Sequence, residues 1–228
     1  MRMLYQNKVL FLGYKLLILG LSAYGLWHQI FFANGIDYSS FYDYTTLSNI
    51  LVFLYFLGSV IMNLSRAIQG IRMRTFLPQG KGALLLLILM TMLVYHFILL
   101  PEAEGSLSLT SLLLQYVLPV MTLLDWVLFD RKGQFVILDP FRWLLLPMLY
   151  FLMMVVRALL GGPIRGESYY PYFFIDVDLL GWRAVWSNVG MLALIFLAIG
   201  LLIWLIDHLW GRWIQFSRKR TYKEKIAK

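Results

Sequence analysis

Six long apolar stretches, separated by short polar segments, run the length of the chain. They cover about residues 9–32, 45–65, 83–100, 109–129, 143–162 and 184–210. A helix of about 20 apolar residues is long enough to cross the hydrocarbon core of a bilayer. The last stretch is longer, so we expect its helix to tilt or to project past the membrane. The pattern predicts an all-α fold, a polytopic bundle of six transmembrane helices.

The composition agrees with a membrane location. The chain is 61% hydrophobic and 14% charged, with a mean hydropathy of +0.72. Soluble domains have about 45–50% apolar and about 25% charged residues, so one soluble core of this size could not bury the excess. The first stretch is longer than the core of a secretory signal peptide, which has about 7–15 residues, and no clear A-x-A site follows it. We therefore expect it to stay in the mature protein.

Basic residues predict the orientation of the bundle. Of the 20 Lys and Arg residues, 16 lie before the first stretch, between the second and third, between the fourth and fifth, or after the sixth. The positive-inside rule then places both termini in the cytoplasm. We divide the chain into a transmembrane domain, residues 1–211, and a basic cytoplasmic tail, residues 212–228, which contacts anionic lipid headgroups. The net charge of +8 is thus explained by topology, and we expect no nucleic-acid partner.

Polar residues open the second stretch, in the sequence FYDYTTLSNILVFLYF. At 100° per residue, Thr45, Thr46, Ser48 and Asn49 share one helix face near the predicted outer end. Polar groups inside a membrane are costly, so each is a candidate functional residue. The alternatives are capping of the helix by one of the threonines and hydrogen bonds between helices.

Other stretches carry polar or ionisable residues at the same predicted level: His28, His96, Gln115, Arg157 and Asn188. Such a ring predicts a polar pocket that is open to the outer leaflet or to outer water. The three histidines have no metal-ligand spacing, and the chain has no cysteine, so we expect no metal and no cofactor.

Four residues inside the stretches have structural interpretations. We expect Asp125 to pair with a cytoplasmic Lys or Arg, or to bond across helices. We expect Lys15 to extend its ammonium group to the inner membrane interface, so its position requires no functional role. Pro119 and Pro147 are expected to kink or locally open their helices.

Several segments together resemble a family of bacterial six-span membrane proteins: YTTLSNILV, VYHFILL, VLPVMTLLDWVLF and YYPYFFIDV. The resemblance extends over residues 10–208. That family is distantly similar to the eukaryotic androgen-induced and androgen-dependent membrane hydrolases. The resemblance implies an intramembrane esterase that cleaves fatty-acid esters of hydroxy fatty acids with a threonine nucleophile and a histidine base.

When the family's pattern is carried over to this chain, the nucleophile is Thr46 if Asn49 is aligned with the acidic or amide residue that lies three positions after the family's threonine. It is Thr45 if the bacterial FTxxSN-like pattern is followed, and the sequence leaves both open. The family's histidine position is occupied by Gln115, which cannot accept and return a proton. His96 is then the best candidate for the general base, and His28 is the second.

The remaining candidate residues would bind the substrate. Asn49, Gln115 or Asn188 would donate to the oxyanion, and Arg157 would hold a carboxylate or phosphate headgroup. Because of Gln115, a second function class stays open, namely a lipid- or small-molecule-binding membrane protein without catalysis. A third is an accessory subunit of a membrane complex or transporter, and the chain could also form a homo-oligomer. The lysine-rich tail, the lack of an organelle signal and the resemblance predict a bacterial plasma membrane.

Overall fold

The fold is known from a computed structural model that describes residues 7–32, 35–102, 107–164 and 166–226. Within these residues, six helices are long and apolar enough to span a membrane: Lys8–Ile30, Tyr44–Ile68, Pro78–Glu102, Leu109–Phe129, Asp139–Leu160 and Val177–Ser217. The predicted all-α class and the six spans are confirmed, although the third, fifth and sixth begin earlier than predicted. The protein is therefore a multi-pass integral membrane protein.

The spans are divided into shorter elements by turns and irregular segments. In chain order the elements are α1 (Lys8–Ile30), β1 (Phe31–Phe32), β2 (Gly35–Ile36), η2 (Tyr38–Tyr42), α2 (Tyr44–Ile68), α3 (Pro78–Val94), η3 (Tyr95–Leu99), η4 (Leu100–Glu102), α4 (Leu109–Leu112), η5 (Leu113–Val117), α5 (Leu118–Phe129), α6 (Asp139–Trp143), α7 (Leu145–Leu160), η6 (Phe173–Ile175) and α8 (Val177–Ile226). The two strands form a small antiparallel hairpin in which Phe31 pairs with Ile36. η3 and η5 are π-helical turns.

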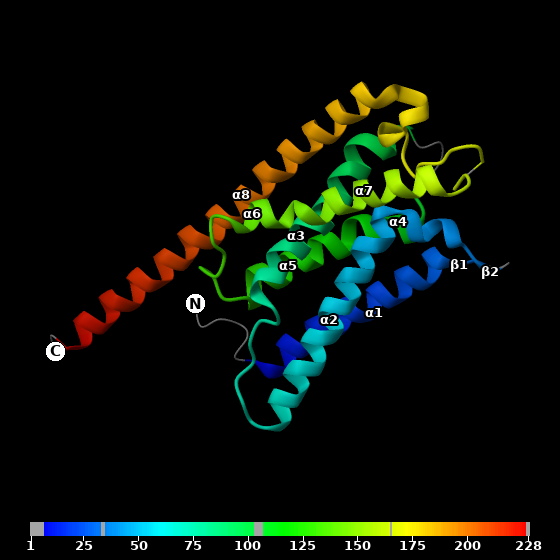
Figure 1. The fold of residues 1–228 in the computed structure, drawn as a ribbon. Coiled ribbons are helices and arrows are strands. Elements are labelled where there is room, and N and C mark those ends of the chain that lie inside the picture. The colour runs from blue at the N-terminus through cyan, green and yellow to red at the C-terminus, as the bar shows by residue number, and fades with distance from the viewer. Residues whose placement is uncertain (1–6, 33–34, 103–106, 165, 227–228) are drawn as a thin grey trace.

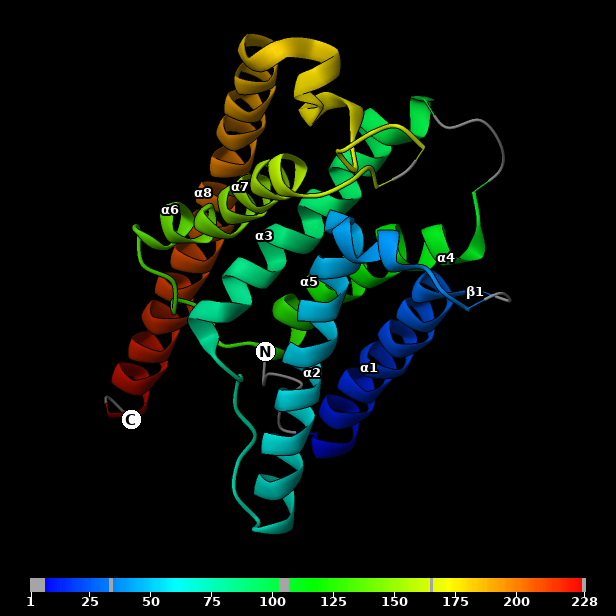
Figure 2. The same cartoon turned by 45° about the vertical axis from the view of Figure 1, so that its right-hand side comes forward.

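The helix α3 lies in the middle of the bundle, where it contacts α2, α5, α6 and α8, while α1 packs on α2 and α5 (Figures 1 and 2). We call the end of the bundle with loops 69–77 and 130–138 the basic end, and the end with loops 31–43 and 161–176 the acidic end. The long helix α8 continues past the other helices at the basic end (Figure 1). The segment predicted as a tail is helical as far as Ile226, and residues 227–228 lie outside the described residues.

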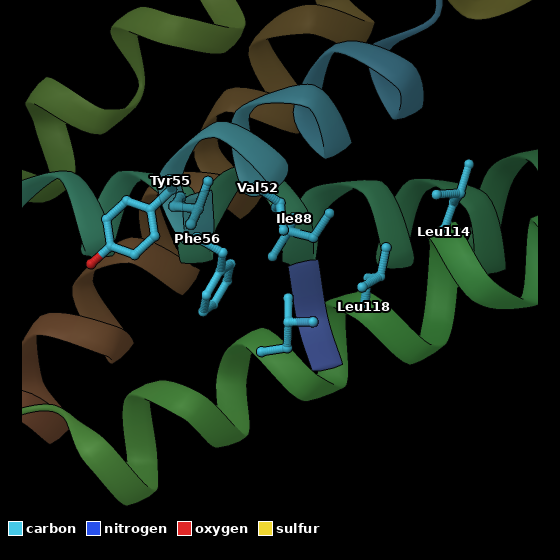
Figure 3. Packing of buried hydrophobic residues seen from close by; sticks show 8 residues of the cluster. Val52, Tyr55, Phe56, Ile88, Leu114 and Leu118 are labelled. Atoms are coloured by element: carbon cyan, nitrogen blue, oxygen red, sulfur yellow. The ribbon is translucent and has the colours of Figure 1, made fainter. Parts of the chain in front are cut away.

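The main core joins α1, α2, α3, η5 and α5 on one side of the bundle. Its buried members, shown in Figure 3, are Ile18, Val52, Tyr55, Phe56, Leu84, Ile88, Leu114 and Leu118. In a bilayer the lipid tails are as apolar as these side chains, so close packing, rather than removal from water, holds such helices together. A second cluster, built around Trp126, Phe135 and Trp143, joins α3 to α6 and α8.

Both intramembrane prolines coincide with helix irregularities, as predicted. A proline lacks an N–H, and its ring clashes with the carbonyl group four residues earlier. Pro119 is the second residue after the π-helical turn η5, and Pro147 is the third residue after the break at Leu144 between α6 and α7. At η5, the Leu114 carbonyl accepts a hydrogen bond from the Asn49 side chain of α2 at 3.2 Å.

Candidate functional site

The polar face of α2 points into the bundle and makes hydrogen bonds between helices. Thr45, Thr46, Ser48 and Asn49 are all buried. The Ser48 hydroxyl lies 2.8 Å from the Thr91 hydroxyl of α3, and the Asn49 amide donates to the Leu114 carbonyl of η5 at 3.2 Å. Asp43 occupies the N-cap position of α2, so neither threonine caps the helix. Ser48 and Asn49 therefore hold α2 against α3 and the π-helical turn.

A cavity of about 70 Å³ lies beside this polar face, and we call it the acidic-end cavity. Its wall is almost entirely apolar and is built by α2, α3, α7, α8 and the loop before α8. The lining residues are Tyr44, Thr45, Met90, Thr91, Val94, Leu99, Pro147, Met148, Tyr150, Phe151, Tyr172, Phe174, Ile175, Val189, Leu192 and Phe196. A water molecule needs about 10–15 Å³ of such a space, so the cavity has room for a short chain of methylene-sized groups.

Three tyrosines and two threonines supply the hydroxyl groups of this wall. The Tyr172 hydroxyl accepts a hydrogen bond from the Tyr44 backbone N–H at 2.9 Å, and the Tyr150 hydroxyl donates to the Tyr42 carbonyl at 2.7 Å. Burial raises the pKa of Tyr172 and outweighs the hydrogen bonds from Tyr44 and Thr45, which lower it. Tyr172 is therefore a neutral phenol at physiological pH.

The loop before α8 closes the cavity at the acidic end. Tyr170 and Ile175 of this loop are buried against α7 and α8. The Asp176 carboxylate accepts hydrogen bonds from the Ser168 hydroxyl and from two backbone N–H groups at the start of α8, each at 3.0 Å. The Asn188 amide donates to the Phe174 carbonyl at 2.9 Å. Asn188 thus positions a loop that forms part of the cavity wall.

The two histidines proposed as bases lie elsewhere. His96 is exposed on η3, where its Nδ1 lies 3.0 Å from the Tyr116 hydroxyl. His28 is exposed near the end of α1 and contacts the Tyr24 ring in a tilted arrangement, with the ring centres 4.5 Å apart. Neither histidine lines the acidic-end cavity. Of the predicted catalytic residues, the structure brings only Thr45 to the cavity wall, while Thr46 is fully buried and does not line the cavity.

The other predicted binding residues also have identifiable positions. The Arg157 guanidinium group lies 4.7 Å from the centre of the Tyr42 ring and donates to the Tyr169 carbonyl at 3.4 Å. Gln115 lies on η5, and its buried side-chain oxygen has no hydrogen-bond partner among the described residues. The predicted ring is therefore distributed over several places rather than gathered around one pocket.

A buried ionic cluster lies nearer the basic end. The Asp125 carboxylate of α5 is 2.8 Å from the Lys15 ammonium of α1 and 2.7 Å from the Lys81 ammonium of α3. All three side chains are at most 1% exposed. The expected pairing of Asp125 with a basic residue across helices is confirmed.

The expectation that Lys15 reaches the interface is wrong, because its ammonium group binds Asp125 inside the bundle. The sequence places Lys81 among the basic residues between the second and third stretches, but α3 begins at Pro78 and places this side chain inside the bundle as well. The sequence did contain a signal for the cluster. A lysine inside an apolar stretch needs a carboxylate, and Asp125 and Asp207 are the only acidic residues within the six stretches.

Comparison of the chain with protein-family models, with curated proteins and with solved structures finds no match in any of the three. The resemblance to the bacterial six-span family therefore stays a prediction.

Proposed function

We propose that the protein binds part of a lipid acyl chain, or part of a similar long apolar molecule, in the acidic-end cavity. The observation that carries this proposal is the nature of the cavity wall, which is almost entirely apolar although a polar helix face lies beside it. Sites for small molecules are typically apolar pockets with a few placed polar groups. Here the hydroxyl groups of Thr45, Thr91 and Tyr172 are those groups.

The course of the cavity also suits a chain-like ligand. It extends from Tyr172 and Phe174 in the loop at the acidic end to Leu192 and Phe196 on α8. An acyl chain that enters among the surrounding lipid tails would lie along this path and leave its polar head near the loop. Met90 and Met148 line the path, and methionine side chains adapt readily to ligands of varied shape.

Native mass spectrometry of the purified protein with oleic acid tests the proposal. Val189→Phe adds a ring to a buried position of the cavity wall, and we expect it to weaken oleic-acid binding at least tenfold. Val156→Phe is the matched control, since it makes the same change at an exposed position of α7. Equal oleic-acid binding by both variants and the unchanged protein would refute the proposal.

A second candidate function is hydrolysis of a lipid ester, and the position of Thr45 favours it. Its side chain is part of the cavity wall, so the carbonyl carbon of a bound ester could approach the hydroxyl oxygen. The threonine oxygen would form a bond to that carbon, the alcohol would leave with a proton, and water would then release the acid. Thr45 is preferred to Thr46 as the nucleophile because Thr46 does not line the cavity.

Hydrolysis of fatty-acid esters of hydroxy fatty acids, assayed with the protein in nanodiscs, tests the second function. We expect Thr45→Ala to abolish turnover and Thr46→Ala to retain most of it. His96→Ala tests whether the exposed histidine acts as the base. The absence of any turnover above that of Thr45→Ala would leave binding without catalysis as the function.

A further inference from the structure

A second, strongly polar cavity lies at the basic end, where loops 69–77 and 130–138 meet. We call it the arginine cavity. Its volume is about 310 Å³, and its polar lining consists of four arginines, Arg66, Arg72, Arg74 and Arg131, together with Thr75 and Gln134. It lies on the far side of the ionic cluster from the acidic-end cavity and shares no lining residue with it.

The first of the two loops is held in place by buried polar groups of α2. The Asn63 side chain, fully buried, accepts from the Arg74 backbone N–H at 3.0 Å and donates to the Arg74 carbonyl at 3.1 Å. The Arg66 side chain donates to the Arg72 carbonyl at 2.8 Å. These bonds use backbone atoms of Arg72 and Arg74, so among the described residues they leave both guanidinium groups available to a ligand.

The second loop is held by α8. The buried Asp207 carboxylate accepts from the backbone N–H groups of Gln134 and Phe135 at 2.7 and 3.0 Å. Gly133 and Gly211 pack so closely that a Cβ atom at Gly211 would lie 2.6 Å from the Gly133 Cα. The Thr75 hydroxyl donates to Asp130 at 3.0 Å and so links the two loops. The cavity is thus formed before any ligand arrives.

The four arginines carry an excess of positive charge. In the part of the chain that the structure describes, none of them lies within 4.0 Å of a carboxylate, since the ion pairs found there join Lys15 and Lys81 to Asp125, and Arg142 to Asp139. Asp130 is the nearest acidic group along the loops, but it is bonded to Thr75, and burial raises its pKa. Four arginines that line one cavity carry like charges, which repel one another, and a bound anion would offset this repulsion.

We propose that the arginine cavity binds a phosphate group, either in the headgroup of an anionic lipid or as a free phosphate. The positive-inside rule explains basic residues at this end, but it is satisfied by scattered lysine or arginine alike. Here all four basic residues of the cavity wall are arginines, whose planar guanidinium group binds phosphate oxygens in pairs. Loop 69–77 joins α2 to α3 and loop 130–138 joins α5 to α6, so the cavity lies at the depth of lipid headgroups if the spans fill the bilayer.

Binding assays with two probes on the detergent-purified protein test this proposal and separate the two sources of phosphate. One probe is inorganic phosphate, followed by calorimetry, and the other is dioleoyl phosphatidic acid, followed by native mass spectrometry. The test variant is Arg72→Gln/Arg74→Gln, which keeps the backbone bonds of both residues and changes exposed side chains only. The control is Arg212→Gln, an exposed arginine at the same end but outside the cavity.

We expect the double variant to weaken binding of at least one probe tenfold or more and the control to change it less than twofold. An effect on phosphatidic acid alone identifies a lipid headgroup, and an effect on inorganic phosphate identifies a free-phosphate site. If the unchanged protein binds neither probe, or if the double variant and the control bind both probes equally, the proposal is overturned. Oleic-acid binding in the same variants stays normal if the acidic-end cavity acts separately.

Discussion

At the scale of single residues, the dominant feature is the Asp125 carboxylate between two lysines. Removing charges from water costs several kcal/mol per ion, and attraction between close partners offsets that cost only when the geometry is good. The Phe11 and Phe56 rings lie within 4.6 and 5.3 Å of the Lys15 ammonium, and the Phe56 ring also lies 4.6 Å from that of Lys81. The cluster ties α1, α3 and α5 together at one point.

Asp125→Asn would leave two buried ammonium groups without a counter-charge. We expect it to lower the free energy of unfolding by about 3–5 kcal/mol, measured by unfolding of the purified protein in SDS. Asp178→Asn, at an exposed position, is the control and should change stability by less than about 0.5 kcal/mol. Equal stability of the two variants would show that the cluster is not ionic.

Replacing all three residues of the ionic cluster should restore most of the stability that the single change removes. The triple variant Lys15→Met/Lys81→Met/Asp125→Leu removes all three charges and keeps the volume similar, so we expect stability to recover to within about 1–2 kcal/mol of the unchanged protein. The same unfolding assay measures it. A triple variant less stable than Asp125→Asn would contradict this explanation of the single change.

At the scale of elements, the close approach of α3 to α6 depends on a glycine. A Cβ atom at Gly82 would overlap the ring of Trp143, which is itself buried. Small residues at helix interfaces in membranes let backbones come close, and packing there supplies much of the stability. Gly82 is therefore required by a particular neighbour and not by its backbone conformation.

Gly82→Ala should destabilise the protein by about 1–3 kcal/mol, because the Trp143 ring must move in a packed interface. Gly80→Ala is a matched control on the same helix, since its nearest neighbour, the Leu77 Cβ, lies at an ordinary 3.5 Å. The control should be neutral or gain up to about 1 kcal/mol from helix propensity. Thermal unfolding followed by circular dichroism compares the two, and equal loss in both would reject the packing argument.

Some elements of the structure could be predicted from the sequence and others could not, because a local pattern reports on one helix and not on its neighbours. The six spans follow from local hydrophobicity, so their number was predictable, as was the inward direction of the Thr45–Asn49 face. The partners of Lys15 and Lys81 were not, because pairing depends on which helices become neighbours. The position of His96 was misleading for the same reason, since membrane depth alone does not determine whether a side chain faces the bundle or the lipid.

At the scale of the whole molecule, the distribution of charge predicts that the basic end faces the cytoplasm. The chain has no cysteine, so single cysteines can be introduced and labelled cleanly. In intact cells, a membrane-impermeant maleimide should label Tyr38→Cys and should leave Ile71→Cys unlabelled until the cells are opened. Both positions are exposed. The reverse labelling pattern would show that the bundle has the opposite orientation, with the arginine cavity on the outer side of the membrane.

The central claim, that the acidic-end cavity holds an acyl chain, is tested most directly by photocrosslinking. The protein is reconstituted in lipid with a fatty acid that carries a diazirine on its chain, irradiated, and mapped by peptide mass spectrometry. We predict adducts concentrated on cavity residues such as Met90, Met148 and Leu192, and their loss in Val189→Phe. Adducts spread over exposed positions such as Leu152 and Leu194, at the same level in both proteins, would contradict the account.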